Sequence, residues 1–403
     1  MEASIPKVSH QGGNGTGIPI FSSEVYQRII NPLGDDDLLT CSLVCRGWCV
    51  LARNQTRIRV HSENVREFVK IVNSLTNTFM ASLRCIDIIV GDSRANRRLV
   101  PLLPRFAALR TLKFWSMGKE DLPALPGLVQ LDLAGAIFPS YARFRAFMAC
   151  LRPTLRNFTF CNVSWESGNP DEAHPFPRFD LESFDLDWGP RPPTEEILFA
   201  IRARRVALSF PKDMVDAPFF DLTSRYLRFL GAHLKRLELN CDEQLDQVAS
   251  VDFSACTGLQ TLQISDALRF NVDRRFSVTL SPALSPLLAC IAPHCRLRHL
   301  ILVVQTAATV EMRSWKPAER LVEILDAQNM ATVRAVKFRV DGTPFWRGGS
   351  ASAAHKNCAP LIHAAVPSSA SRRIECAVGN GADSDEDEED AAEEEYEMDD
   401  EED

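Results

Sequence analysis

The sequence lacks any hydrophobic run long enough to enter or cross a membrane. Residues 1–17 are polar and glycine-rich, which argues against a secretory signal peptide there. No stretch approaches the roughly 20 apolar residues that span a bilayer. We therefore expect an intracellular protein, in the cytoplasm, the nucleus or both. Its 12 cysteines lie mostly among apolar neighbours, as reduced thiols do in those compartments.

Recognisable signatures of catalysis are also lacking. The sequence has neither a His-Glu-x-x-His metalloprotease motif nor a Gly-x-Ser-x-Gly nucleophile motif. The glycine-rich stretch 12–17 is not followed by the Gly-Lys-Ser/Thr of a phosphate-binding loop. Cys290, His294, Cys295 and His299 form the cluster with the most metal-like spacing, but we interpret them as packing and surface residues. We expect no enzyme, no cofactor and no bound metal.

Basic residues are absent from the acidic tail, which we define as residues 383–403. These 21 residues contain 16 acidic side chains, so the formal net charge of −8 conceals a body of 45 basic and 37 acidic residues. Like charges repel and few apolar residues are present, so we expect the tail to be disordered. It could keep the chain soluble, bind a basic partner or screen the basic body.

A repeated pattern dominates residues 61–340. The template Leu-x-x-Leu-x-Leu, with any large apolar residue at its three fixed positions, recurs at intervals of 19 to 38 residues. Its ten copies begin at Leu83, Leu109, Leu128, Leu155, Leu181, Ala203 (a degenerate copy), Leu234, Leu259, Leu297 and Val333. Most intervals lie near the 20–29 residues of leucine-rich repeats. Apolar and polar residues alternate in each copy, which is typical of a half-buried strand.

The repeats predict an α/β fold in which short strands and return segments stack into a solenoid. The strands would form a parallel sheet on its concave face, with helical return segments such as residues 64–79. An ordinary α/β protein with similar strands is the alternative. Residues 341–382 have no such period, and we expect them to be irregular and poorly ordered.

Residues 18–60 form a separate, compact region with apolar residues at helical spacing. Pro32, Gly34 and Gly47 interrupt the spacing, so we expect three short helices. About 40 residues cannot enclose a good core alone, and some apolar surface must be covered by a neighbour or a partner.

The residues of this region resemble an F-box, most closely the fungal, basidiomycete-like form. The resemblance rests on the segments Pro19-Ile20-Phe21-Ser22-Ser23-Glu24-Val25-Tyr26 and Leu43-Val44-Cys45-Arg46-Gly47-Trp48. It implies that residues 18–60 dock on a Skp-type adaptor and, through it, on a cullin. The implied adaptor-binding residues are Pro19, Ile20, Val25, Ile29, Leu33, Leu38, Leu43, Val44 and Trp48.

The same resemblance implies the substrate-recognition subunit of a Skp–cullin–F-box ubiquitin ligase, with the repeats holding a protein substrate. In that family the reactive thiols belong to other subunits. Two alternatives stay open: a repeat scaffold that binds a partner without ubiquitin transfer, and an acidic-tailed chaperone for basic nuclear proteins. We expect no direct binding to nucleic acid or membrane.

The polar positions of the repeats predict where a substrate would bind. In a strand, residues between the apolar ones face the opposite side, here the concave side. The candidate substrate-binding residues are Lys113, Trp115, Asp132, Asp185, Asp187, Glu238 and Gln263. Their acidic members would form a stripe in the middle of the array that favours a basic target segment. An ordinary solvated sheet face is the alternative, and Trp115 could instead belong to the core.

Overall fold

The computed structural model describes most of residues 57–306 and two strands beyond them. The described residues are 57–74, 80–81, 83–90, 93–116, 122–168, 175–188, 193–210, 217–241, 245–248, 250–265, 268–271, 277–290, 295, 297–306, 314–315, 333–342 and 373–379. The F-box-like region, its nine predicted adaptor-binding residues and the acidic tail lie outside them. No described helix is long and apolar enough to cross a membrane.

One twelve-stranded sheet organises the described chain. Its strands are β1 (Arg57–His61), β2 (Cys85–Ile89), β3 (Thr111–Trp115), β4 (Gln130–Ala134), β6 (Asn157–Cys161), β8 (Phe179–Asp187), β9 (Ile201–Ser209), β10 (Arg236–Asn240), β11 (Thr261–Ser265), β14 (His299–Thr306), β16 (Ala335–Gly342) and β17 (Arg373–Gly379). They lie in the sheet in the order in which they occur in the sequence, and every neighbouring pair is parallel.

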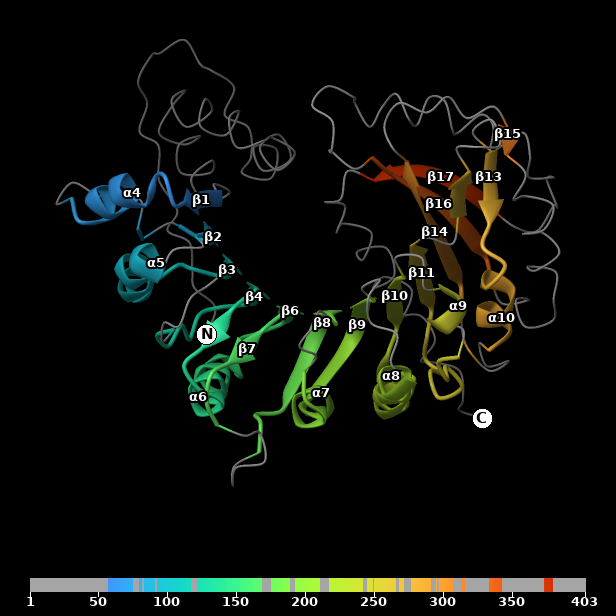
Figure 1. The fold of residues 1–403 in the computed structure, drawn as a ribbon, viewed down its shortest axis with the longest axis horizontal. Coiled ribbons are helices and arrows are strands. Elements are labelled where there is room, and N and C mark those ends of the chain that lie inside the picture. Colours follow the sequence, from blue (N-terminus) through green and yellow to red (C-terminus); the bar gives the residue numbers. More distant parts are fainter. Residues whose placement is uncertain are drawn as a thin grey trace, which may run out of the picture.

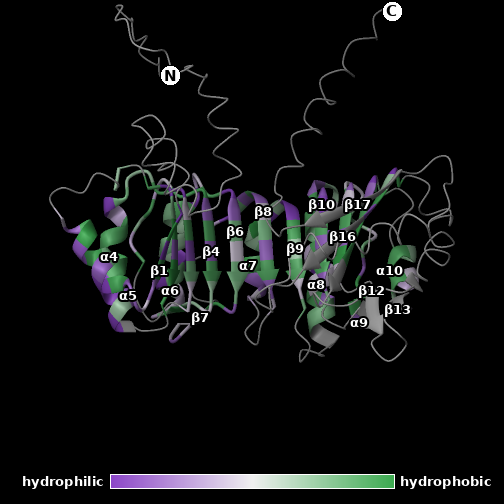
Figure 2. Cartoon of the chain, turned by 90° about the horizontal axis from the view of Figure 1, so that it is seen from above, coloured by the Kyte–Doolittle hydropathy of each residue, from purple (hydrophilic) through white to green (hydrophobic). Residues whose placement is uncertain are grey.

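Each new strand is therefore added beside the previous one, on the same edge of the sheet. Figure 1 shows the resulting arc, with the strands on its inner side. Figure 2 views them from above, side by side in sequence order. This arrangement is the α/β architecture with a long parallel sheet that the repeats predict, and it is compatible with a solenoid.

Helices lie on the outer side of the arc (Figure 1). Their bounds are α4 (Val65–Val72), α5 (Ser93–Leu99), α6 (Tyr141–Leu151), α7 (Glu195–Ala200), α8 (Ala217–Leu230), α9 (Leu245–Val248) and α10 (Leu284–Ala289), with short 3₁₀ helices η1 (Val100–Arg105) and η2 (Gly231–His233). Helix α4 is shorter than the predicted 64–79. Helix α6 begins where the Ser140 hydroxyl accepts a hydrogen bond from the Arg143 backbone N–H, at 3.3 Å.

Two small sheets accompany the large one. Strands β5 (Ile137–Phe138) and β7 (Ser164–Trp165) pair in parallel. Strands β12 (Leu268–Asn271), β13 (Ser277–Leu280) and β15 (Ser314–Trp315) form the other, in which β12 and β13 are antiparallel.

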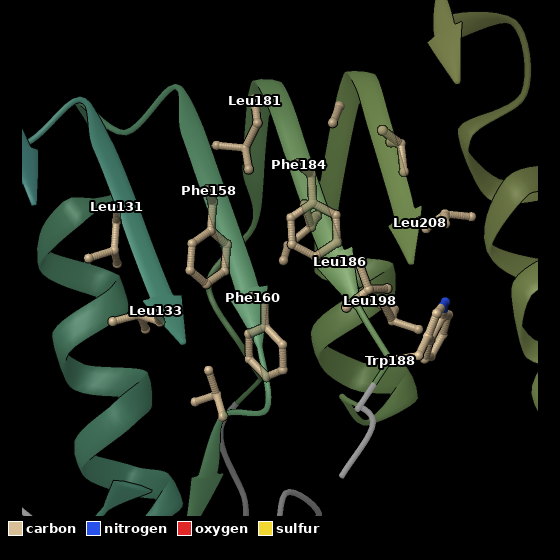
Figure 3. Packing of buried hydrophobic residues seen from close by; sticks show 14 of the residues in the cluster. Leu131, Leu133, Phe158, Phe160, Leu181, Phe184, Leu186, Trp188, Leu198 and Leu208 are labelled. Atoms are coloured by element: carbon tan, nitrogen blue, oxygen red, sulfur yellow. The ribbon is translucent and has the colours of Figure 1, made fainter. Parts of the chain in front are cut away.

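The core lies between the sheet and the outer helices. All ten first positions of the template are buried. The next apolar positions stand in one register across the sheet, so that Leu131 pairs with Phe158 and Phe158 with Phe184. Rings from the helices pack against them, as with Phe144 of α6 and Phe160 of β6, whose centroids are 6.2 Å apart. Figure 3 shows buried side chains of neighbouring strands, among them Leu131, Phe158 and Phe184.

Both ends of the sheet differ from the sequence expectation. Residues 57–60 were expected to belong to the helical F-box-like region, yet Arg57–His61 forms β1 and pairs with β2. Residues 341–382 were expected to be irregular, yet Arg373–Gly379 forms β17 and pairs with β16. Each strand has the alternating pattern, but a polar residue, Gln55 or Ser371, occupies the first template position. The template therefore missed them.

Candidate functional site

The inner face of the sheet, which we define as the side turned away from the helices, carries every residue of the predicted substrate-binding set. Lys113 lies opposite Asp132, and the same row continues through Thr159 and Asp185. Beyond Ala207 it reaches Glu238 and Gln263. Trp115 and Asp187 lie in the next row toward the strand ends, joined through Ala134 and Cys161.

Three carboxylates of this face, Asp87, Asp132 and Glu238, form ion pairs with basic side chains, of which the sequence prediction included only Lys113. At the first strands, the buried Asp87 carboxylate forms an ion pair with Arg57, and Arg59 Nε lies 3.6 Å from the same oxygen. Asp132 pairs with Lys113 and accepts a hydrogen bond from the Thr159 hydroxyl at 3.1 Å.

A second cluster surrounds Glu238. Arg205 Nη2 lies 2.6 Å and Arg236 Nε 3.1 Å from Glu238 Oε1. The Gln263 amide donates to Glu238 Oε2 at 3.2 Å. A buried carboxylate with two guanidinium partners and an amide donor fixes these three strands relative to each other.

Basic residues interleave with the predicted acidic stripe. From β1 to β11 the face carries Asp87, Asp132, Asp185, Asp187 and Glu238, and equally many bases, Arg57, Arg59, Lys113, Arg205 and Arg236. The bases lie beside the carboxylates because of how neighbouring strands pair. The sequence of each repeat, taken alone, does not reveal this pairing. From β1 to β11 the formal charges of the inner face therefore balance.

Asp185 is the carboxylate whose charge is least favoured. Burial raises its pKa, the charges of Glu238 and Asp132 raise it further, and Arg205 partly offsets them. The Ser183 hydroxyl donates a hydrogen bond to Asp185 Oδ1 at 3.2 Å. Asp185 thus contributes a hydrogen-bonding position whose negative charge is disfavoured by burial.

The inner face also has two cysteines, and both are poor nucleophiles. Burial, together with Asp87, raises the pKa of Cys85 to about 11. Burial raises the pKa of Cys161 to about 12, with a contribution from Asp187, whose carboxylate accepts the thiol hydrogen bond at 3.1 Å. These thiols stay protonated at neutral pH, whereas nucleophilic catalysis needs the thiolate.

An apolar pair is exposed at the ends of strands β2 and β3. Trp115 is 49% exposed and Ile89 is 36% exposed, and the two are register partners. Trp115 therefore belongs to the surface and not to the core. Its strand neighbour Phe114 is fully buried, because successive residues of a strand face opposite sides. An exposed tryptophan on an otherwise internally paired polar face is a typical anchor for a protein partner.

The cysteine–histidine cluster is separated in the part of the chain that the structure describes. The Cys295 thiol is buried and donates to the Leu259 carbonyl at 3.1 Å, whereas Cys290 is exposed. His294 lies outside the described residues. No group of three or more potential metal ligands occurs among the described side chains.

No protein-family model matches the sequence, and no curated protein matches it. Among solved structures, the chain is similar to one from the crystal structure of the Rad7 and Elc1 complex in yeast. The identity is 12%, the match covers 81% of this chain and 90% of that chain, and the TM-score is 0.26. The strand order and register, and not this match, therefore define the fold.

Proposed function

We propose that the protein is the substrate-recognition subunit of a Skp–cullin–F-box ubiquitin ligase. Residues 18–60 would dock on a Skp-type adaptor, and the inner face of the sheet would hold a protein substrate. The chain itself would perform no chemistry. It would place a substrate lysine near a loaded conjugating enzyme, and proximity would supply the rate enhancement.

The observation that carries this proposal is the continuous inner face that directly follows the F-box-like sequence. Eleven neighbouring strand pairs hold that face in one register. Asp87, Asp132 and Glu238 are held in ion pairs within the chain, so the face is a preformed surface. Preformed surfaces bind with little loss of conformational entropy.

The exposed pair Ile89 and Trp115 would be the substrate anchor. Burying a tryptophan removes 150–250 Å² from water on the usual scale of aromatic side chains. The surrounding polar groups would supply specificity through hydrogen bonds more than through net charge. The predicted substrate is accordingly a segment with an exposed apolar side chain, and not a merely basic one.

Co-purification of the tagged full-length chain from cells tests both halves of the proposal. The wild-type chain is expected to bring down a Skp-type adaptor and a cullin. Leu43→Ala with Trp48→Ala is expected to lose both. Ile89→Ala with Trp115→Ala is expected to keep the adaptor and cullin and to lose substrates that accumulate when the proteasome is inhibited.

Two outcomes would contradict the proposal. If the wild-type chain brings down neither an adaptor nor a cullin, the proposed role in a ubiquitin ligase is wrong. Recovery of the adaptor without a cullin favours instead a repeat scaffold that binds partners without ubiquitin transfer. The double variant of Ile89 and Trp115 is expected to stay folded, because substitutions at exposed surface positions usually change stability by no more than about 0.5 kcal/mol. A loss of substrate from this variant therefore reports lost binding and not unfolding.

A further inference from the structure

Basic side chains line the edge of the sheet at which the strands begin. The second position of the repeat template carries Arg or Lys in seven of ten copies, and we call these residues the basic edge: Arg84, Arg110, Arg156, Arg204, Lys235, Arg298 and Arg334. All are exposed except the half-buried Arg298. Figure 2 shows hydrophilic residues along this edge.

Backbone hydrogen bonds hold these residues in one line. In the second half of the array, the Lys235 N–H donates to the Arg204 carbonyl at 2.7 Å. The chain of bonds continues through Gln260 to Arg298 and from Arg298 to Arg334, at 2.7 to 2.8 Å. From β9 to β16 the edge thus presents four bases and no acidic residue at this position.

These charges are not neutralised within the described chain. The side chains of Arg204, Lys235, Arg298 and Arg334 form no ion pair with any described residue. The inner face differs, because each base there has a carboxylate neighbour. Burial lowers the pKa of the neighbouring His233, and the positive charges of Arg202 and Arg204 lower it further, despite Asp180 at 3.3 Å.

We propose that the acidic tail, residues 383–403, binds along the basic edge of its own sheet between β9 and β16. The tail has 16 acidic residues and no basic one, which complements an edge of unpaired bases. It is also covalently attached, so its effective concentration at the edge is in the millimolar range. A bound tail would exclude other polyanions and would border the inner face. This inference does not rest on the proposed ligase function.

The tail is long enough to reach the whole edge, and the bases nearest β17 require the least extension of it. Strand β17 ends at Gly379, at the edge opposite the basic one, because all strands run in parallel. Crossing back along its seven residues requires about 23 Å. Residues 380–403 span at most about 80 Å when fully extended. Strand β9 lies five strand spacings from β17, or about 24 Å, whereas β2 lies ten spacings away, or about 48 Å.

Carbodiimide crosslinking of the full-length chain, followed by mass spectrometry, tests the proposal. This reagent joins an amine to a carboxylate that touches it. Lys235 is expected to crosslink to residues within 383–403, and Arg204→Lys is expected to add a second such site. Both crosslinks should fall at least tenfold in 0.5 M NaCl, where the Debye length is about 4 Å.

Arg228→Lys supplies the matched control. Arg228 is exposed on the outer helix α8 and lies 3.1 Å from Asp252, so the introduced lysine should crosslink to Asp252 and not to the tail. Arg84→Lys, at the far end of the edge, should crosslink at least tenfold less often than Lys235. Mixing ¹⁵N-labelled and unlabelled chains distinguishes crosslinks within one chain from those between copies.

Three results would overturn the proposal. The first is a lack of crosslinks from Lys235 to the tail while the Arg228→Lys control reacts with Asp252. The second is equal crosslinking of the tail to the basic edge and to the outer helix, which would indicate non-specific electrostatic attraction and no defined binding site. The third is crosslinking only between labelled and unlabelled chains, which assigns the edge to a second copy.

Discussion

Asp185 shows how a single side chain of the inner face is governed by its neighbours. The charges of Glu238 and Asp132 raise the pKa of Asp185 beyond the effect of burial, and the charge of Arg205 partly offsets them. The sequence indicates an acidic residue at this position, but the direction of its pKa shift follows from burial and from strands that are distant in the chain.

Replacing Asp185 by asparagine is expected to stabilise the protein at neutral pH. The folded state raises the pKa of this carboxyl above its ordinary value of 3.8, so the folded chain binds the proton more tightly than the unfolded chain. Stability contributed by this group therefore falls as pH rises through that window, and the loss is complete above the folded pKa. Asp185→Asn removes the loss and still accepts the Ser183 hydrogen bond.

Thermal unfolding across the pH range measures this effect. The Tm of Asp185→Asn is expected to exceed that of the wild type by a few degrees at pH 7, and the difference should vanish toward pH 4. Glu182→Gln, at an exposed position of the same strand, is the control and should leave Tm unchanged at both values. A variant Tm below that of the wild type at pH 7 would mean that the Arg205 interaction outweighs burial.

At the scale of elements, the sequence predicts the strand of each repeat because the pattern that specifies a strand is local. Alternation of apolar and polar residues is enforced by the geometry of a strand, so each copy of the template carries its own evidence. All ten predicted copies form strands in one continuous register, including the degenerate copy at Ala203. The end strands β1 and β17 do not match the template, because terminal units of a repeat array are atypical.

The sequence does not predict how closely the backbones of neighbouring repeats approach at their junctions. Gly127 and Gly258 both stand directly before the first leucine of a template copy and look equivalent in sequence. In the structure, a Cβ added at Gly258 would lie 1.9 Å from the Ala232 carbonyl oxygen, whereas one at Gly127 would meet nothing nearer than 3.5 Å. Only Gly258 is therefore required for close approach of two backbones.

Gly258→Ala is expected to destabilise the protein, and Gly127→Ala is expected to be nearly neutral. The first variant must displace the backbone of the preceding repeat, which typically costs about 1–3 kcal/mol. The second adds a methyl group at ordinary van der Waals distance. Denaturant unfolding compares them, and equal free energies of unfolding for the two variants would contradict the assigned close approach.

At the scale of the whole molecule, the large sheet of the described chain is a linear stack in which each strand pairs with at most two others. Long-range cooperativity must pass through successive interfaces between repeats. The densest aromatic packing lies mid-array, where Phe160 contacts Phe158 and Phe144 with centroids 6.0 and 6.2 Å apart. A destabilising substitution in this packing is expected to increase local unfolding of the neighbouring strands first.

Phe160→Ala tests this expectation. Removing a fully buried phenylalanine typically costs about 3–5 kcal/mol. Hydrogen exchange should accelerate most in β4, β6 and β8 and least in β14 and β16. Phe160→Leu, which keeps most of the volume, should show the same pattern at smaller size. Uniform acceleration across all strands would instead show that the sheet unfolds as one cooperative unit.

The amino-acid sequence by itself determined the strands of the ten template copies, the buried side of each of these strands and the difference in charge between body and tail. These properties depend on residues a few positions apart, and elementary strand geometry converts them into structure. The tertiary structure alone decided which charges meet, because Arg205 and Glu238 are 33 positions apart and become neighbours only through register. The same register placed bases beside Asp132 and Glu238 of the expected acidic stripe and aligned the bases of the basic edge along one side of the sheet.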